Sequence, residues 1–425
     1  GNPLIGGRLI SLLISIPSFF ALYAFMKKSF DEKTAFISAL LLATSPLAIL
    51  FQSLALMDGM LFSCTIYIVY LLNEFRLREK KLILLTIGSI LGSLLWIKTT
   101  ALFIIIPTII ITVLLTAQKF GFIPRSLWRS RTKLISNTAS IVLPVFFISL
   151  PLIFLPNFSK VLSEPGSFSF SLHELISFPI TSWALNFVYA FYGYMIYFTP
   201  IVFLFGLIGA YTYRKEKSLA PLYFLGLMIL FSIFLVKIFR IRYILFAVVG
   251  VIPFASLFLT RTHAVRLFNR LKYALCVGSS FSISFILIFN PHLFFSFFPE
   301  NSILTREREY AYGWTSGDGV KNLIEFIEKT PRSMQRRIVL FTEDAPGNPS
   351  DFLMARYYFD PTMIISPLAI SKDHLMEVSK NVKNAYVVTR NIRIDKTVEP
   401  YLSLVQSFPE YDSHEFLGLY KLQFP

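Results

Sequence analysis

Asp58 is the first residue whose type and surroundings indicate chemistry. It is the only acidic residue between positions 33 and 73, and its neighbours are Leu, Met and Gly. Aspartate is a good helix N-cap, and an acid among apolar residues is also typical of a functional site. The two roles are compatible, and we interpret Asp58 as a site acid that acts as a base or holds a substrate hydroxyl.

Basic residues stand out in two further places. Lys98 lies between two apolar stretches, where its ammonium group either extends to the membrane surface or binds an anion such as phosphate. Lys237, Arg240 and Arg242 share one short segment with Tyr243, and no acidic residue lies within 20 positions on either side. Arginine binds phosphate oxygens in pairs and tyrosine adds a hydrogen bond, so we favour a phosphate site here over binding of lipid headgroups.

Aromatic residues crowd the stretch from Trp183 to Tyr194. We interpret it as an aromatic belt at a membrane surface, with a sugar-stacking or lipid-stacking surface as the alternative.

An acid combined with a cluster of cations fits the transfer of a group from a lipid phosphate. The acid would activate an acceptor hydroxyl or hold the transferred sugar. The cations would stabilise the negative charge that grows on the leaving phosphate. We therefore expect Asp58, Lys98 and residues 237–243 to form one site, which requires that they share one face of a membrane.

The composition places these residues in a membrane protein. Hydrophobic residues fill 55% of the 425 positions, mean hydropathy is +0.62, and only 15% are charged. These values exclude a disordered chain, a collagen-like chain and an ordinary soluble enzyme. The net charge of +15 is divided unevenly, with +17 on residues 1–298 and −2 on residues 299–425. We expect a transmembrane domain over 1–298, a soluble domain over 299–425 and no nucleic-acid partner.

The apolar stretches predict ten membrane-spanning helices, each of which needs about 20 mostly apolar residues. They are expected at residues 5–26, 34–55, 57–73, 82–97, 100–117, 134–155, 194–213, 219–236, 242–260 and 273–297. The stretch 82–117 is too long for one crossing, and we divide it at Lys98. Residues 156–193 are interpreted as a loop with an interfacial helix, and a further span near 175–192 stays open.

Basic residues in the loops predict the orientation. One set of alternate loops contains 19 Lys and Arg residues, and the opposite side contains six. The first set comprises residues 27–33, 76–81, 118–133, 214–217 and 261–272. Cytoplasmic loops carry the excess of positive charge, so the candidate site and the C-terminal domain are expected outside the cytoplasm. The first span then runs inward, and we expect at least one more span upstream of residue 1.

Residues 299–425 predict a small α/β domain with a partly parallel sheet. Helices are expected at 320–329, 349–358 and 373–380, and strands at 337–342, 362–366, 385–389, 402–408 and 415–422. The loop Gly347-Asn348-Pro349-Ser350 follows the first strand, where ligands often bind in α/β folds. The sequence has no Gly-rich nucleotide-binding motif, so we expect a structural or acceptor-docking role.

Cysteine and histidine residues predict neither a disulfide nor a metal site. Cys64 and Cys276 both lie in apolar stretches and are interpreted as small buried residues. The five histidines do not have the spacing of metal ligands.

Short motifs follow one another along the chain in a recognisable order. They are Gly7-Arg8-Leu9-Ile10-Ser11 with Thr34-Ala35, Ser45-Pro46 with Leu56-Met57-Asp58, Gly92 with Lys98 and Pro107, Arg242-Tyr243-Ile244-Leu245 with Pro253, and Gly313-Trp314-Thr315-Ser316-Gly317-Asp318-Gly319-Val320. In this order and topology, the sequence resembles the GT-C membrane glycosyltransferases. The most similar branch is glycosyltransferase family 39, which contains protein O-mannosyltransferases and lipid A aminoarabinose transferases.

The resemblance implies a polyprenyl-phosphate sugar donor, eleven or more spans, inversion at the anomeric carbon and an acceptor on the outer face. It also implies a main catalytic Asp in the first outer loop, which we expect upstream of residue 1. Asp58 then corresponds to the second acid, and the fragment alone is expected to be inactive. Some GT-C enzymes use a divalent metal, although no ligand cluster in this sequence requires one.

We therefore expect an integral membrane glycosyltransferase that transfers a hexosyl or pentosyl group to a glycan, lipid or protein acceptor. Its location would be a prokaryotic cytoplasmic (inner) membrane, with membrane lipids as further partners. The alternative is a transporter or flippase of an anionic polyprenyl-linked lipid, and a third hypothesis is a scaffold built around the C-terminal domain. The sequence shows no internal repeat, and its unusual cations gather at one face, which favours the enzyme.

Overall fold

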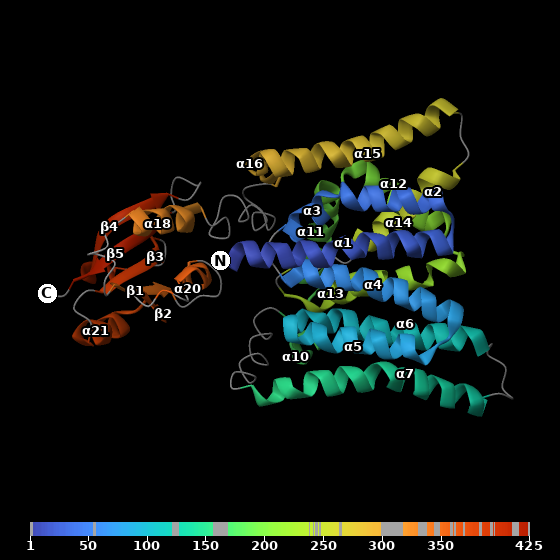
Figure 1. Ribbon diagram of the computed structural model, residues 1–425, viewed down its shortest axis with the longest axis horizontal. Coiled ribbons are helices and arrows are strands. Elements are labelled where there is room, and N and C mark those ends of the chain that lie inside the picture. The colour runs from blue at the N-terminus through green and yellow to red at the C-terminus, as the bar shows by residue number, and fades with distance from the viewer. Residues whose placement is uncertain are drawn as a thin grey trace. The chain divides into compact units, whose positions relative to one another are not determined.

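The computed structural model of this chain divides into two compact units, which are Leu4–Phe289 and, in the main, Asn290–Pro425 (Figure 1). The structure describes residues 3–53, 57–120, 127–155, 169–237, 239–240, 242, 245, 248–262, 266–298, 318–329, 338–343, 349–357, 360, 363–368, 370–381, 385–391, 394, 396–409 and 416–423.

The described part of the first unit consists mainly of helices. Its helices are α1 (Pro3–Ser29), α2 (Glu32–Ala43), α3 (Pro46–Ser53), α4 (Met57–Arg78), α5 (Lys81–Ile97), α6 (Leu102–Phe120), α7 (Leu127–Ser149), α10 (Leu172–Ile176), α11 (Ile180–Tyr197), α12 (Pro200–Thr212), α13 (Ala220–Leu235), α14 (Val248–Arg261) and α15 (Arg266–Phe289), with the short 3-10 turns η1 (Thr99–Ala101), η3 (Leu150–Phe154) and η4 (Lys217–Leu219). Each predicted span overlaps at least one of these helices, although the span 34–55 is divided between α2 and α3 by a bend of 58°. The predicted division at Lys98 is confirmed because α5 ends at Ile97.

By length and composition, five described helical segments could each cross a membrane. They belong to α1, α4, α6 with η1, α7 with η3, and α15. The bent pairs α2–α3 and α11–α12 raise the number to seven, and α5, α13 and the described part of α14 are shorter apolar helices. The chain is thus a polytopic, mainly α-helical membrane protein, as predicted.

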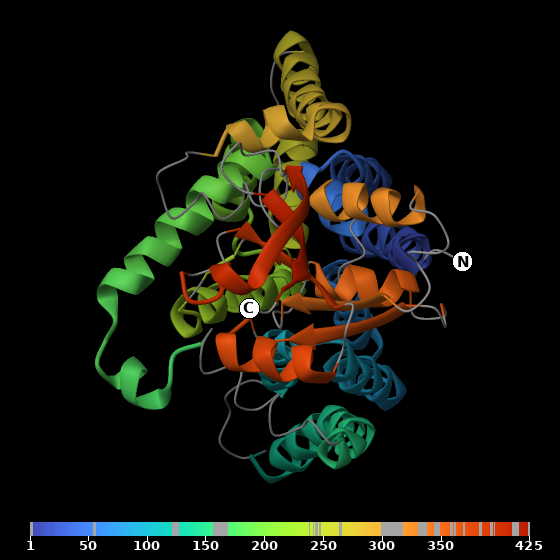
Figure 2. The same ribbon diagram turned by 90° about the vertical axis from the view of Figure 1, so that its left-hand side faces the viewer.

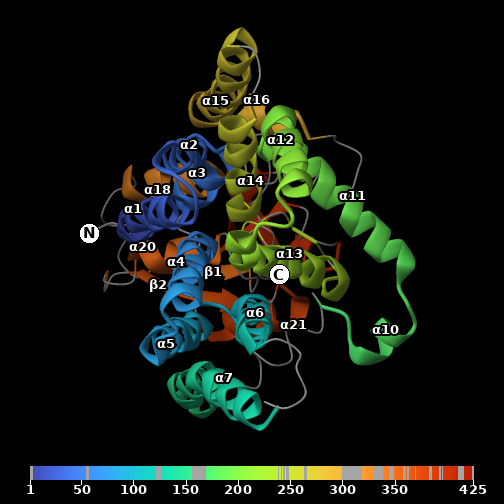
Figure 3. The same ribbon diagram turned by 90° about the vertical axis from the view of Figure 1, so that its right-hand side faces the viewer.

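The predicted span 194–213 is wrong in its first residues. Thr199 has a φ of 64°, and Pro200 takes the first position of α12, so the chain bends by 114° between α11 and α12. Figures 2 and 3 look along most of the helices and show α11 lying crosswise to them. This orientation fits the interfacial helix predicted for residues 156–193, of which 156–168 lie outside the described residues.

Glycines allow two helix pairs to pack closely. Gly88 and Gly92 of α5 face α7, and a Cβ atom on Gly88 would lie 2.5 Å from the carbonyl oxygen of Ile141. Gly209 of α12 similarly faces the carbonyl oxygen of Phe254 in α14. Small residues at such positions let helix backbones approach each other in a membrane, where packing replaces the hydrophobic effect between helices.

The second unit contains a five-stranded sheet in the order β2-β1-β3-β5-β4. Its elements are α16 (Pro291–Ser296), α18 (Asp318–Lys329), β1 (Ile338–Glu343), α20 (Ser350–Tyr357), β2 (Met363–Leu368), α21 (Lys372–Asn381), β3 (Ala385–Arg390), η7 (Glu399–Tyr401), β4 (Leu402–Pro409) and β5 (Phe416–Leu422). Strand β1 pairs in parallel with β2 and β3, whereas β5 pairs antiparallel with β3 and β4. The predicted α/β domain with a partly parallel sheet is confirmed.

Two apolar cores cover the sheet. One core joins α18 and α20 to the sheet through Leu323 and Leu353, and the other centres on Leu375 of α21. At the carboxyl ends of β1 and β3, the buried side chains of Glu343 and Arg390 form a bidentate ion pair with N–O distances of 2.9 and 3.2 Å. The motif residues 313–317 and the loop residues 347–348 lie outside the described residues.

The substitution Gly209→Ala is expected to lower the melting temperature of the detergent-solubilised protein. The added methyl would collide with the Phe254 carbonyl oxygen, and overpacking of this kind costs about 1–3 kcal/mol. Gly278→Ala in α15 is the matched control, since nothing lies within 4 Å of a Cβ atom there. Equal melting temperatures for the two variants would contradict close packing of α12 on α14.

Candidate functional site

Asp58 and Lys98 form an ion pair. The Lys98 Nζ lies 2.7 Å from Asp58 Oδ1, and the Asp58 side chain is 3% exposed against 25% for Lys98. Sequence reasoning singled out each residue but did not pair them. A buried carboxylate needs a partner of opposite charge, and this ion pair supplies it.

Helix ends bring the two residues together. Asp58 lies in the first turn of α4, where the helix dipole favours a negative charge. Lys98 has extended backbone angles between α5 and η1, so the chain reverses at this residue. Gly59 faces the carbonyl oxygen of Phe51 in α3, and a side chain there would push α4 away. The acid is therefore fixed by α3 on one side and by Lys98 on another.

The second group of cations lies between α13 and α14. Helix α13 ends at Leu235 and α14 begins at Val248, and the described residues between them (236–237, 239–240, 242 and 245) belong to neither helix. The side chains of Lys237, Arg240 and Arg242 are each partly buried, and Tyr243 lies outside the described residues. Irregular backbone at membrane depth occurs where it is buried in protein or lines a cavity, as in ligand sites.

Lys237 forms an ion pair with Glu174, which was not among the predicted site residues. Its Nζ lies 2.7 Å from the Glu174 carboxylate of α10. This hydrogen bond, with two further bonds from Ser171, lowers the pKa of Glu174 to about 2. The Ser171–Glu174 spacing is that of a capping box, a pattern visible in the sequence.

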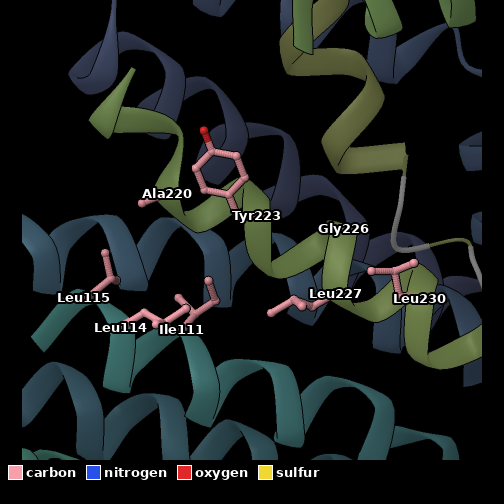
Figure 4. Close-up of a pocket in the computed structure, with 8 residues that line it drawn as sticks. All are labelled: Ile111, Leu114, Leu115, Ala220, Tyr223, Gly226, Leu227 and Leu230. Carbon is pink, nitrogen blue, oxygen red and sulfur yellow. The ribbon is translucent and has the colours of Figure 1, made fainter. Parts of the chain in front are cut away.

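The two groups of cations share one end of the helical unit. Figure 1 shows that α3 and α5 end, and α4 and α6 begin, at this end, which we call the Lys98 end. Figure 4 shows that α13 runs opposite to α6, from Ala220 near Leu115 to Leu230 on the side of Ile111, so α13 ends where α6 begins. Helix α13 packs against both α4 and α6. The structure thus brings Asp58 and Lys98 into direct contact and places Lys237, Arg240 and Arg242 at the same end of the bundle.

The aromatic stretch of α11 packs against the same region. Tyr189 is buried and meets Phe239 edge-to-face, with ring centroids 5.4 Å apart. Tyr197 is also buried, and its ring centroid lies 6.4 Å from that of Phe51 in α3. These side chains pack inside the helical unit instead of forming only the surface belt that we favoured.

An apolar groove lies between α6 and α13 (Figure 4). It has a volume of about 390 Å³ and is lined by Ile111, Leu114, Leu115, Ala220, Tyr223, Gly226, Leu227 and Leu230. A Cβ atom on Gly226 would meet nothing within 4 Å, so this glycine leaves the groove open. Both helices lead at one end to the candidate cations, α6 through Lys98 and α13 through Lys237.

Within the described residues, no group of three or more His, Cys, Asp or Glu side chains could hold a metal ion. Cys276 is buried, Cys64 is partly buried, and both are free thiols.

Comparisons with known proteins identify the fold. A family model described as dolichyl-phosphate-mannose-protein mannosyltransferase matches residues 1–154, which include Asp58 and Lys98. No curated protein sequence matches the chain. The structure is similar to that of ArnT from Cupriavidus metallidurans bound to undecaprenyl phosphate, with a TM-score of 0.51 and 12% identity over 99% of this chain and 85% of that chain.

Two further solved structures are similar. Ligand-free ArnT from the same organism has a TM-score of 0.50 and 13% identity, with coverage of 98% of this chain and 84% of that chain. The ligand-free oligosaccharyltransferase of Archaeoglobus fulgidus has a TM-score of 0.47 and 12% identity, and the match covers 90% of this chain and 58% of the oligosaccharyltransferase chain. The predicted resemblance to GT-C membrane glycosyltransferases is confirmed by the family model for residues 1–154 and by ArnT for the fold.

Proposed function

We propose that this protein transfers a sugar from a polyprenyl-phosphate donor to an acceptor hydroxyl at the outer face of a membrane. The observation that carries the proposal is the Asp58–Lys98 ion pair, at the same end of the bundle as the cationic segment of Lys237, Arg240 and Arg242. The ArnT structure with a similar fold was solved with bound undecaprenyl phosphate, which supports a lipid phosphate as the ligand class.

In the proposed reaction, the acceptor oxygen attacks the anomeric carbon while the bond from that carbon to the phosphate oxygen breaks. A carboxylate takes the acceptor proton, and polyprenyl phosphate leaves with the electron pair of the broken bond. An ammonium group can donate to more than one acceptor at a time, so we propose that Lys98 contacts a phosphate oxygen while it binds Asp58. Asp58 thus orients Lys98, and Arg240, Arg242 and Tyr243 complete the phosphate site together with Lys237.

We propose that the groove between α6 and α13 holds part of the polyprenyl chain. Leu230 precedes Lys237 by seven residues, or about 10 Å of helix rise. The groove therefore begins about 10 Å along α13 from the proposed phosphate site, on the side away from the Lys98 end. Its walls are Leu, Ile and Ala side chains with one Tyr, which suits a hydrocarbon.

The charge distribution supports a cytoplasmic location for the opposite end of the bundle. There, Lys28 of α1 and Arg78 of α4 both pair with Glu74, and Arg261 ends α14. By the positive-inside rule, the Lys98 end then faces outward, and a prokaryotic inner membrane is the proposed location.

The substitution Lys98→Met is expected to lower kcat/KM for the donor about 10–100-fold, because it removes a charge-assisted hydrogen bond worth about 1.5–3 kcal/mol. Asp58→Asn removes the negative charge that holds Lys98, and it should also lower kcat/KM for the donor at least about tenfold. Transfer of labelled sugar by membranes containing the full-length gene product measures both effects.

Lys28→Met is the matched control, since Lys28 pairs with Glu74 between α1 and α4 at the opposite end. It should leave the KM for the donor unchanged. Wild-type activity of both Lys98→Met and Asp58→Asn would contradict the assignment of Lys98 and Asp58 to the donor site. If intact lipid crossed the membrane without release of free polyprenyl phosphate, the protein would be a transporter instead of a transferase.

The substitution Gly226→Leu is expected to fill the groove and raise the KM for an undecaprenyl-linked donor several-fold, without affecting a donor with two isoprene units. The short chain does not extend to Gly226, which precedes Lys237 by about 16 Å of helix rise, so it serves as an internal control. Gly278→Leu, at another open glycine on α15, controls for added bulk. The groove proposal fails if Gly226→Leu affects long-chain and short-chain donors equally.

A further inference from the structure

Four consecutive carbonyl groups at the C-terminal end of α13, those of residues 233–236, are paired with two segments that precede it in the chain. Asn186 Nδ2 donates to the carbonyl oxygens of Ile233 and Val236 at 3.0 and 2.7 Å. Between these two, the Phe234 carbonyl accepts from Trp183 Nε1 at 3.0 Å. The Leu235 carbonyl accepts from the backbone N–H of Phe170 at 2.9 Å.

These hydrogen bonds pair backbone carbonyl groups that the helix itself leaves without a partner. The last four carbonyl groups of any helix have no partner within that helix, and in apolar surroundings each unpaired group costs free energy. Many helices end at a Gly or with water, but α13 leads into a sequence without Gly up to residue 249. Four consecutive carbonyls, 233–236, are instead capped by α11 and the residues before α10.

Asn186 lies at the centre of this cap. It is 5% exposed, and it is the only amide side chain in the aromatic stretch 183–194. Its two contacts span the last turn of α13 and end at Val236, the residue directly before Lys237. One turn further along α11, Tyr189 packs on Phe239, so the same helix face contacts the segment on both sides of Lys237.

We propose that Asn186, assisted by Trp183, is a positioning residue that sets where the cationic segment leaves α13. It does not contact the reacting groups. It fixes Val236, and thereby directs Lys237, Arg240 and Arg242 toward the phosphate. This role rests on the proposed function, because it assigns to that site a residue that acts through the cations.

The test measures binding of undecaprenyl phosphate to the purified full-length protein by native mass spectrometry. Asn186→Leu is expected to raise the Kd about tenfold, the effect of one misplaced charge-assisted hydrogen bond to phosphate. Combined with the triple variant Lys237→Ala, Arg240→Ala and Arg242→Ala, it should weaken binding little beyond that triple variant alone, because Asn186 acts through these cations.

Asn137→Leu is the matched control. Asn137 of α7 is a buried Asn whose Nδ2 donates to Thr116 Oγ1 of α6 at 3.2 Å, and neither helix carries the cationic segment. It should lower the melting temperature without changing the Kd. If Asn186→Leu does not fold, Trp183→Phe removes one N–H donor but keeps the ring, and should raise the Kd about threefold.

Two results would overturn the inference. One is a normal Kd for both Asn186→Leu and Trp183→Phe, and the other is full additivity of Asn186→Leu with the triple variant. Failure of the proposed function has a different signature, in which the triple variant itself binds undecaprenyl phosphate as tightly as the wild type.

Discussion

The ion pair between Asp58 and Lys98 is the constraint around which the candidate site is built. A carboxylate that is 3% exposed, in a mainly apolar bundle, is stable only if a cation reaches it. Lys98 can do so because the chain leaves helical geometry for one residue between α5 and η1. The pair therefore ties the start of α4 to the α5–α6 reversal.

A second constraint is the pairing of backbone groups where helices break. At the end of α13, α11 supplies the partners, and the released segment carries the cations. The break between α2 and α3 follows the same rule, because the Thr44 carbonyl accepts from Ser280 and Ser284 of α15. In both cases a neighbouring helix provides hydrogen bonds that water would supply elsewhere.

Much of the fold could be predicted from the sequence, because long apolar stretches and alternating patterns directly report spans and strands. The division at Lys98 and the C-terminal sheet are examples. The bend at Thr199 was missed because the apolar stretch runs through it without interruption. The partners Glu174 and Asn186 were missed because their roles depend on residues about 50–60 positions away, which spacing cannot reveal.

The most direct test of the account is a cryo-electron microscopy structure of the full-length protein in a lipid nanodisc with undecaprenyl phosphate. We expect the phosphate within hydrogen-bonding distance of Lys98 and of Arg240 or Arg242, with the chain entering the groove beside Gly226. Phosphate density bound elsewhere on the protein, with Lys98 contacting only Asp58, would contradict the account.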